Sequence, residues 1–196
     1  MKVLVLGIWP SPITPILKGF NCAVQKLSGP VTVDFLESEE IEFAVSYRYR
    51  HIIRSPVIKY LEEKIINLHI SFLPWNRGAD PNLWSFLEDT PKGFTIHYLD
   101  EGLDSGDIIV QKQVTFDTAA ETLRTTYEKL NNGVLELFRQ EWPSIAHGNA
   151  GRVKQPTYGS IHRSKDKDKF MYLLTEKGWD TPVEKVLGKA VNKSNS

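Results

Sequence analysis

The hydrophobic and polar positions along the chain fall into blocks that predict strands separated by helices. Residues 1–7 form a short apolar run that ends in glycine, which is typical of a buried parallel strand. Ser11 and Pro12 predict a helix start, with Ser11 at the N-cap and Pro12 at the first helical position. A helix is predicted over residues 56–64, and further strands at residues 31–35, 41–46 and 65–69. Strands that alternate with helices indicate an α/β fold with a parallel sheet.

The pattern changes after residue 90. Residues 93–99 and 107–116 read as two strands of a β-hairpin, joined by the acidic loop D-E-G-L-D-S-G. Thr118 with Glu121 then predicts a capping box. The helix that follows has an apolar face at core spacing, made of Leu123, Tyr127, Leu130, Val134 and Leu137 or Phe138.

The C-terminal segment differs from the rest in charge. From Arg152 on it carries ten Lys and Arg against five Asp and Glu, whereas the preceding residues carry fourteen against nineteen. Apolar residues at 170–174 and 179–187 predict a helix and a hook that lie on the main domain, with residues 189–196 frayed. We therefore expect a main domain over residues 1–150 and an extension over residues 151–196 that packs on its core.

Composition narrows the class of protein. The 196 residues include 24 Lys and Arg and 24 Asp and Glu, and this balance excludes a strongly basic nucleic-acid-binding domain. One cysteine, Cys22, excludes an intrachain disulfide and a cysteine-based zinc site, and fits a reducing cytoplasm. No run approaches the roughly 18 apolar residues of a membrane helix, and the N-terminus shows no cleavage site of a signal peptide. We expect a cytoplasmic protein with no membrane contact.

Two segments carry candidate chemistry. Asn67 and His69 end the predicted strand at 65–69, and residues two apart on a strand share one face. In an open parallel sheet ligands bind at that end of the strands, although a histidine there can equally be structural. The acidic loop 100–107 can be a solvated turn or can hold a carboxylate that orients a histidine. A calcium loop lacks its ligand spacing, and a zinc site on His69 and His97 lacks a suitable ligand pair.

Taken together, the segments N-L-H-I-S-F-L-P-W-N-R-G-A-D-P and G-F-T-I-H-Y-L-D-E-G-L-D-S-G-D resemble the folate-dependent formyltransferase family. The family pattern is N-x-H, S-x-L-P, R-G-x-x-P, G-V-T-x-H and D-x-G-D. The matching positions are Asn67 and His69, Ser71 to Pro74, Arg77-Gly78 to Pro81, Gly93-Phe94-Thr95, and Asp104 to Asp107. The resemblance covers residues 41 to 145 well, and it implies a Rossmann-like, mostly parallel sheet flanked by helices, with the β-hairpin carrying the catalytic Asp loop.

The resemblance implies transfer of a formyl group from N10-formyltetrahydrofolate, as co-substrate, to an amine. Attack on the formyl carbon builds an oxyanion that needs hydrogen-bond donors, which Asn67 and a protonated His69 can supply. Asp104 would orient His69, favour its cationic form and relay a proton through water. No metal and no covalent intermediate is expected, and Cys22 and Ser71 are interpreted as structural.

The resemblance also places the folate. The loop after the preceding strand should hold the pterin through backbone groups backed by apolar side chains. By position, the contacts are Arg50, His51, Ile52 and Ile53, with Leu99 and Asp100 closing the other side.

The predicted acceptor is an amino sugar that is linked to a nucleotide. The run S-Y-R-Y-R-H-I-I and Trp84 resemble the formyltransferase domain that acts on UDP-4-amino-4-deoxy-arabinose. Asp80 stands where sugar-nucleotide N-formyltransferases often have Asn. The expected acceptor-binding residues are Ser11, Trp75, Arg77, Asp80, Asn82 and Trp84. The acceptor is the only expected partner, apart from a second copy of the chain in a homodimer.

Three alternatives remain open. Methionyl-tRNA formyltransferase has a further C-terminal domain for which this chain ends too early, and only the tail is basic enough for phosphate contacts. Glycinamide ribonucleotide transformylase has a glycine-rich phosphate loop that Gly7 to Ser11 match poorly, although a helix start there could accept a phosphate. The third is a degenerate folate-binding module. The presence of all three residues Asn67, His69 and Asp104 argues against it. Fewer residues precede Asn67 than the family usually has, so a shortened N-terminal half is expected.

Overall fold

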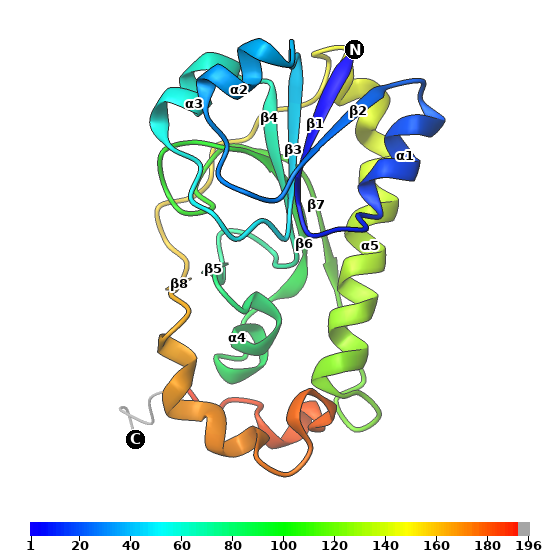
Figure 1. Cartoon of the computed structure of the whole chain (residues 1–196). Coiled ribbons are helices and arrows are strands. Elements are labelled where there is room, and N and C mark those ends of the chain that lie inside the picture. Colours follow the sequence, from blue (N-terminus) through cyan, green and yellow to red (C-terminus); the bar gives the residue numbers. More distant parts are fainter. Residues whose placement is uncertain (192–196) are drawn as a thin grey trace. The chain divides into compact units, whose positions relative to one another are not determined.

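The computed structural model describes residues 1–191, and its strands form one main sheet and one small sheet (Figure 1). The main sheet has the strand order β2-β1-β3-β4-β6-β7. The pairs β1–β2, β1–β3 and β3–β4 are parallel, and β6 and β7 are neighbours joined by the loop 99–107. The bounds are Lys2–Gly7 (β1), Ala23–Leu27 (β2), Phe43–Tyr47 (β3), Ile65–His69 (β4), Lys92–Tyr98 (β6) and Ile108–Val114 (β7). The predicted α/β class with a mostly parallel sheet is confirmed.

The chain divides into two compact units, which we describe separately. The first contains Met1–His69, Ile96–Val110 and Val134–Gln155. The second contains Ile70–Thr95, Gln111–Gly133 and the chain from Pro156 on. Both units combine segments that are distant in sequence, so the predicted division at residue 150 stays a prediction.

The core of the first unit has two sides. On one side, α2 (Val33–Ser38) and α3 (Ser55–Leu61) cover β1 and β3 (Figure 1), where Leu36, Val57 and Leu61 pack with Leu4 and Leu6. On the other side lie α1 (Ile13–Gly19) and the end of α5 (Leu123–Ala146), and the Trp142 ring meets Phe43 edge-on at 5.2 Å. A parallel strand that is covered on both faces reads as a continuous apolar run, which explains why β1 and β4 could be predicted.

The strand predicted at residues 31–35 is wrong. Those residues lead into α2, whose N-cap Thr32 accepts a hydrogen bond from the Phe35 N–H at 3.2 Å. The strand in this part of the chain is β2, at Ala23–Leu27, where no residue is buried. Because β2 is an edge strand with polar residues at Gln25 and Lys26, the apolar run that marks the inner strands is absent.

The two predicted helix caps are displaced. α1 begins at Ile13 with Pro12 at the N-cap, so the prediction of Ser11 at the N-cap is one residue early. The predicted box of Thr118 and Glu121 is not the cap of α5. Instead Thr122 Oγ1 accepts from the Thr125 N–H at 3.2 Å, and Thr125 Oγ1 accepts from the Thr122 N–H at 2.9 Å. This reciprocal pair satisfies two backbone donors and starts the helix at Leu123.

The second unit contains α4 (Pro81–Leu87), the small parallel sheet of β5 (Arg77–Gly78) and β8 (Ile161–His162), and three 3₁₀ helices at Asp166–Leu174, Gly178–Asp180 and Val183–Lys185. Leu174, Val183 and Val186 pack in one apolar cluster with residues of α4. The Ala190 N–H donates to the Leu87 carbonyl at 2.8 Å. The predicted fraying from residue 189 stays a prediction, and residues 192–196 lie outside the described part of the chain.

Among residues 1–191, none of the helices has both the length and the apolar character that a bilayer crossing requires.

Candidate functional site

Two strand ends and one loop of the first unit bring polar side chains together. Asn67 and His69 end β4, and His97 lies near the end of β6, the neighbour of β4 in the main sheet. Asp104 lies in the loop between β6 and β7. His69 and His97 are buried, at 7% and 0% exposure.

The carboxylate of Asp104 is the centre of this cluster. Asn67 Nδ2 donates to Asp104 Oδ1 at 3.1 Å. His69 Nδ1 lies 3.6 Å from Asp104 Oδ2, and His97 Nε2 lies 3.5 Å from Asp104 Oδ1. Of the three residues that the sequence motifs select as catalytic, Asn67 and His69 thus both lie against the Asp104 carboxylate, although their roles stay predictions.

His97 is the member of the cluster that the motifs did not select. Its Nδ1 lies 2.8 Å from the Tyr98 carbonyl, and because a carbonyl only accepts, this nitrogen carries a proton. In the neutral ring Nε2 is then an acceptor, and Asn67 Nδ2 lies 3.3 Å from it. His97 thereby fixes the orientation of the Asn67 amide. Its signal in the sequence is the histidine that ends G-F-T-I-H.

The loop that presents Asp104 is tightly folded. Asp104 itself has a left-handed backbone, with φ of 50°. Asp100 accepts hydrogen bonds from the Gly102 N–H at 3.0 Å and from the Ser105 hydroxyl at 2.8 Å. A Cβ on Gly106 would lie 1.9 Å from the Tyr98 carbonyl oxygen, so this close approach requires glycine.

Glu101 ties the same loop to α3. It accepts a hydrogen bond from the Ser55 hydroxyl, and Lys59 Nζ lies 3.6 Å from its carboxylate. The Ser55 hydrogen bond, helped by the charge of Lys59, holds the pKa of Glu101 below its usual range.

The predicted folate loop has an exposed part and an anchored part. Arg50, His51 and Ile52 are exposed, Ile52 at 89%. Ile53 and Leu99, which come from the two predicted sides of the folate site, pack against the same apolar cluster. The Asp100 carboxylate is engaged inside its own loop.

Tyr49 anchors the start of this loop. Its hydroxyl donates to the Gly29 carbonyl at 2.6 Å and accepts from the Val31 N–H at 3.1 Å. Burial raises the pKa of Tyr49. The loop is therefore fixed at one end while its tip stays open to a ligand.

Of the predicted acceptor-binding residues, Ser11 lies in the first unit and the other five in the second. Ser11 is buried and its hydroxyl faces the Ile13 N–H at 3.4 Å. Trp75 lies 6.0 Å from the ring of Tyr158, and Arg77 donates to the Pro156 carbonyl at 3.2 Å.

The start of α4 holds three of these residues, Asp80, Asn82 and Trp84, and each of them contacts other residues of the second unit. Asp80 pairs with Lys167 at 2.8 Å. Asn82 donates to the Leu123 carbonyl at 2.9 Å, and Trp84, only 2% exposed, stacks on His162 with ring centroids 3.7 Å apart. Through these contacts Asn82 and Trp84 stabilise the second unit. The acceptor-binding role of all six residues stays a prediction.

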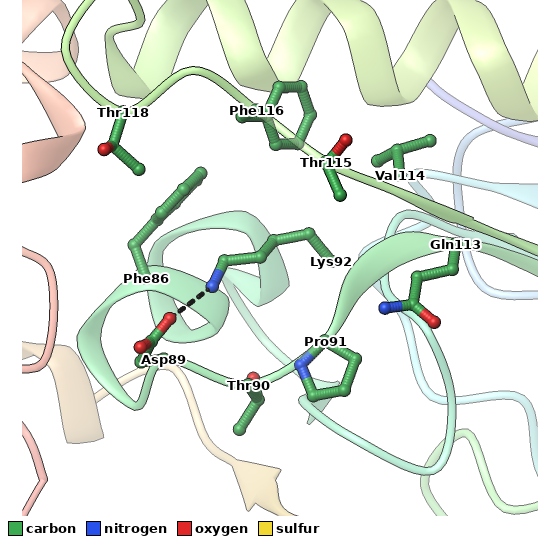
Figure 2. A pocket seen from close by; sticks show the side chains of 10 residues that line it. All are labelled: Phe86, Asp89, Thr90, Pro91, Lys92, Gln113, Val114, Thr115, Phe116 and Thr118. Carbon is green, nitrogen blue, oxygen red and sulfur yellow. Dashed lines mark hydrogen bonds and ion pairs between the residues drawn. The ribbon is translucent and has the colours of Figure 1, made fainter.

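The second unit also contains a pocket of about 370 Å³, shown in Figure 2. The Lys92 ammonium, paired with Asp89 at 2.7 Å, reaches along it (Figure 2). Its lining residues are Phe86, Asp89, Thr90, Pro91, Lys92, Gln113, Val114, Thr115, Phe116 and Thr118. None of the predicted site residues is among them, so the candidate site rests on the cluster around Asp104 and not on this pocket. Within the described residues, no group of three His, Cys, Asp or Glu side chains is arranged to hold a metal ion.

Comparisons with known proteins agree with the sequence motifs. Residues 12–138 match the family model of formyl transferases. Cytosolic 10-formyltetrahydrofolate dehydrogenase of Xenopus laevis is 31% identical over 178 residues, which are 88% of this chain and 19% of that protein. The chain thus spans about a fifth of the length of the curated relatives it matches.

Solved structures give a more similar relative. The formyltransferase PseJ from Anoxybacillus kamchatkensis, in complex with UDP-4,6-dideoxy-4-formamido-L-AltNAc and tetrahydrofolate, is 48% identical. The match has a TM-score of 0.92 and covers 97% of this chain and 100% of that one. Methionyl-tRNA formyltransferase from Clostridium thermocellum shares the fold at 13% identity, with a TM-score of 0.67 over 86% of this chain and 74% of that one. The predicted family is confirmed: the chain belongs to the formyl transferase family.

Proposed function

We propose that this protein transfers the formyl group of N10-formyltetrahydrofolate to the amino group of a nucleotide-linked amino sugar. The meeting of Asn67 and His69 at the Asp104 carboxylate carries the proposal, because a module that only binds folate does not need all three. The relative PseJ, which is bound to a formamido sugar nucleotide and to tetrahydrofolate, supports the choice of substrates. We also propose a cytoplasmic location, which the free thiol of Cys22 supports.

The reaction exchanges one amide bond for another. The acceptor nitrogen attacks the formyl carbon and builds a tetrahedral intermediate with a negative oxygen. The bond between the formyl carbon and N10 then breaks, the acceptor nitrogen loses a proton, and N10 gains one. The protein must stabilise the oxyanion and move this proton.

Asn67 and His69 are the donors for the oxyanion. The two N–H groups of the Asn67 amide lie within reach of Asp104 and His97, at 3.1 and 3.3 Å. One of them must therefore turn to the oxyanion, and the longer contact, to His97, is the one that is given up at lower cost. A protonated His69 adds a charge-assisted hydrogen bond.

Asp104 orients His69 and takes part in the proton transfer. The 3.6 Å between His69 Nδ1 and Asp104 Oδ2 exceeds a direct hydrogen bond. Catalytic contacts often tighten only in the complex with substrate, and a bridging water serves the same transfer. By this route Asp104 accepts the proton that leaves the acceptor amine, while His69 donates a proton to N10.

The direct test is a turnover assay with N10-formyltetrahydrofolate and a panel of acceptors, which follows the release of tetrahydrofolate and the mass of the product. We expect formylation of a UDP-linked or dTDP-linked aminodeoxy sugar. Turnover on charged initiator tRNA or on glycinamide ribonucleotide, with none on any sugar, would contradict the acceptor class. Folate affinity in calorimetry without any turnover would identify a binding module instead.

Replacing Ile52 with aspartate is expected to raise the KM for the formyl donor about tenfold and to leave kcat nearly unchanged. Ile52 is 89% exposed, so it contributes little to the folded core, whereas covering its side chain with a folate ring would remove apolar surface from water. Steady-state kinetics at saturating acceptor measure both constants. Tyr172→Asp, at a position 64% exposed in the second unit, is the matched control, and an unchanged KM in Ile52→Asp would remove Ile52 from the folate site.

A further inference from the structure

The chain after α5 returns to the loop that carries Asp104. Val153 and Ile108 form an antiparallel bridge, with N–H···O hydrogen bonds of 2.8 and 2.9 Å in the two directions. The segment 152–155 therefore runs beside the start of β7, where the loop ends. None of the motifs of the sequence includes it.

Gln155 grips the backbone of the loop. Its Nε2 donates to the Asp104 carbonyl at 2.8 Å and to the Gly106 carbonyl at 2.7 Å. A primary amide has two N–H groups, so both hydrogen bonds form at once. They hold the carbonyl groups of Asp104 and Gly106, the residues on either side of Ser105.

The two hydrogen bonds of Gln155 hold a part of the loop whose backbone conformation is energetically unfavourable. A residue other than glycine in the left-handed region, as Asp104 is at φ of 50°, persists only where its surroundings enforce it. The direction of the Asp104 side chain follows from that backbone, and with it the 3.1 Å contact to Asn67 and the 3.6 Å contact to His69. Small displacements of a catalytic group cost large factors in rate.

Arg152 braces the same loop at its base. Its guanidinium lies over the Tyr98 ring at 4.2 Å, and its Nε lies 3.3 Å from Asp107 Oδ2. Tyr98 precedes the loop and Asp107 ends it, so one side chain spans both ends. Arg152 is half exposed and contacts the two ends of the loop. The hydrogen bond to the carbonyl of Asp104 itself comes from Gln155.

We propose that Gln155 is a positioning residue for the formyl transfer: its amide fixes the backbone of Asp104 and so keeps the Asp104 carboxylate against His69 and Asn67. This inference rests on the proposed function. Gln155 acts through the carbonyl groups of the loop and through no substrate atom.

The test compares Gln155→Ala and Gln155→Glu with the wild-type chain. Neither variant can donate to the two carbonyls at neutral pH, and Gln155→Glu keeps the size of the side chain. We expect kcat to fall at least about tenfold while the KM for the formyl donor stays within about threefold, because only the placement of Asp104 is lost. Gln140→Ala, at an exposed glutamine of α5, is the control and keeps wild-type kcat.

A double-mutant cycle separates positioning from a general structural role. In an Asp104→Asn background, Gln155→Ala should lower the remaining kcat less than twofold, since the group it positions is already disabled. An equal loss in both backgrounds, or wild-type kcat in Gln155→Ala, would overturn the proposal.

Amide hydrogen exchange gives a readout that needs no turnover. The amides of residues 99–107 should exchange about tenfold faster in Gln155→Ala than in wild type, with the strands unchanged. If the wild-type chain formylates no acceptor, the proposed function fails, and exchange alone then decides whether Gln155 holds the loop. Unchanged exchange would refute the contact itself.

Discussion

Replacing His69 with alanine is expected to lower kcat at least about a hundredfold, within the range that general acid–base and oxyanion groups contribute. The side chain is 7% exposed and its ring faces the Asp104 carboxylate, so the variant loses both the donor to the oxyanion and the proton carrier. The measurement is the rate of tetrahydrofolate release at saturating donor and acceptor. Asp104→Asn should lose at least as much, because its side chain keeps the shape and loses the charge.

His147→Ala provides the matched control, since this exposed histidine directly follows α5 and its Nδ1 lies 2.6 Å from the Pro143 carbonyl, outside the cluster around Asp104. The double variant of His69→Ala and Asp104→Asn should be hardly slower than the slower single variant, because residues that act as one unit do not add. Near wild-type turnover of His69→Ala would remove this residue from the chemistry.

The part of the site that follows from the sequence is the part set by local geometry. Asn67 and His69 are two residues apart on a strand that is buried and apolar up to its end, so their common face and their place at the sheet edge follow from the pattern. The place of Asp104 follows from its motif and from the hairpin that returns it to the same edge.

The part that could not be predicted depends on contacts between distant residues. Gln155 lies 51 residues beyond Asp104, and nothing in the spacing of the segment 152–155 indicates that it meets the loop. His97 looks like any histidine in a strand until β6 is placed beside β4. Trp84 resembles a substrate contact in sequence, whereas its stacking on His162 becomes visible only once β8 pairs with β5.

The exposed edge of the sheet shows a second limit. β2 pairs with β1 through backbone hydrogen bonds, with Val24 beside Val3, although none of its own side chains is buried. Hydrophobic periodicity reflects the burial of side chains and not the pairing of backbones, so it does not predict an edge strand whose side chains are exposed. The short capped helix α2 is the complementary case, because Val31, Val33 and Phe35 alternate with polar residues, a pattern that predicts a strand buried on one face.

Replacing Asn67 with alanine is expected to lower kcat about a hundred- to a thousandfold, the loss that follows removal of one preorganised oxyanion donor. The KM for the formyl donor should change little, because the oxyanion exists only in the transition state and its donor contributes little to ground-state binding. Steady-state kinetics over both substrates distinguish these effects. Asn132→Ala, at an exposed asparagine of α5, is the control.

Comparing the Asn67 variant with a His97 variant tests how the contacts among Asn67, His97 and Asp104 are organised. Asn67 is the residue whose amide nitrogen contacts both His97 and Asp104, so its removal leaves those two groups facing each other at 3.5 Å without the N–H groups of that amide. His97→Gln should therefore cost less than Asn67→Ala, since it disturbs the orientation of the Asn67 amide and leaves the donor in place. A His97→Gln variant slower than Asn67→Ala would instead make His97 a direct participant in the transfer, and the oxyanion would have to be assigned to a different pair of donors.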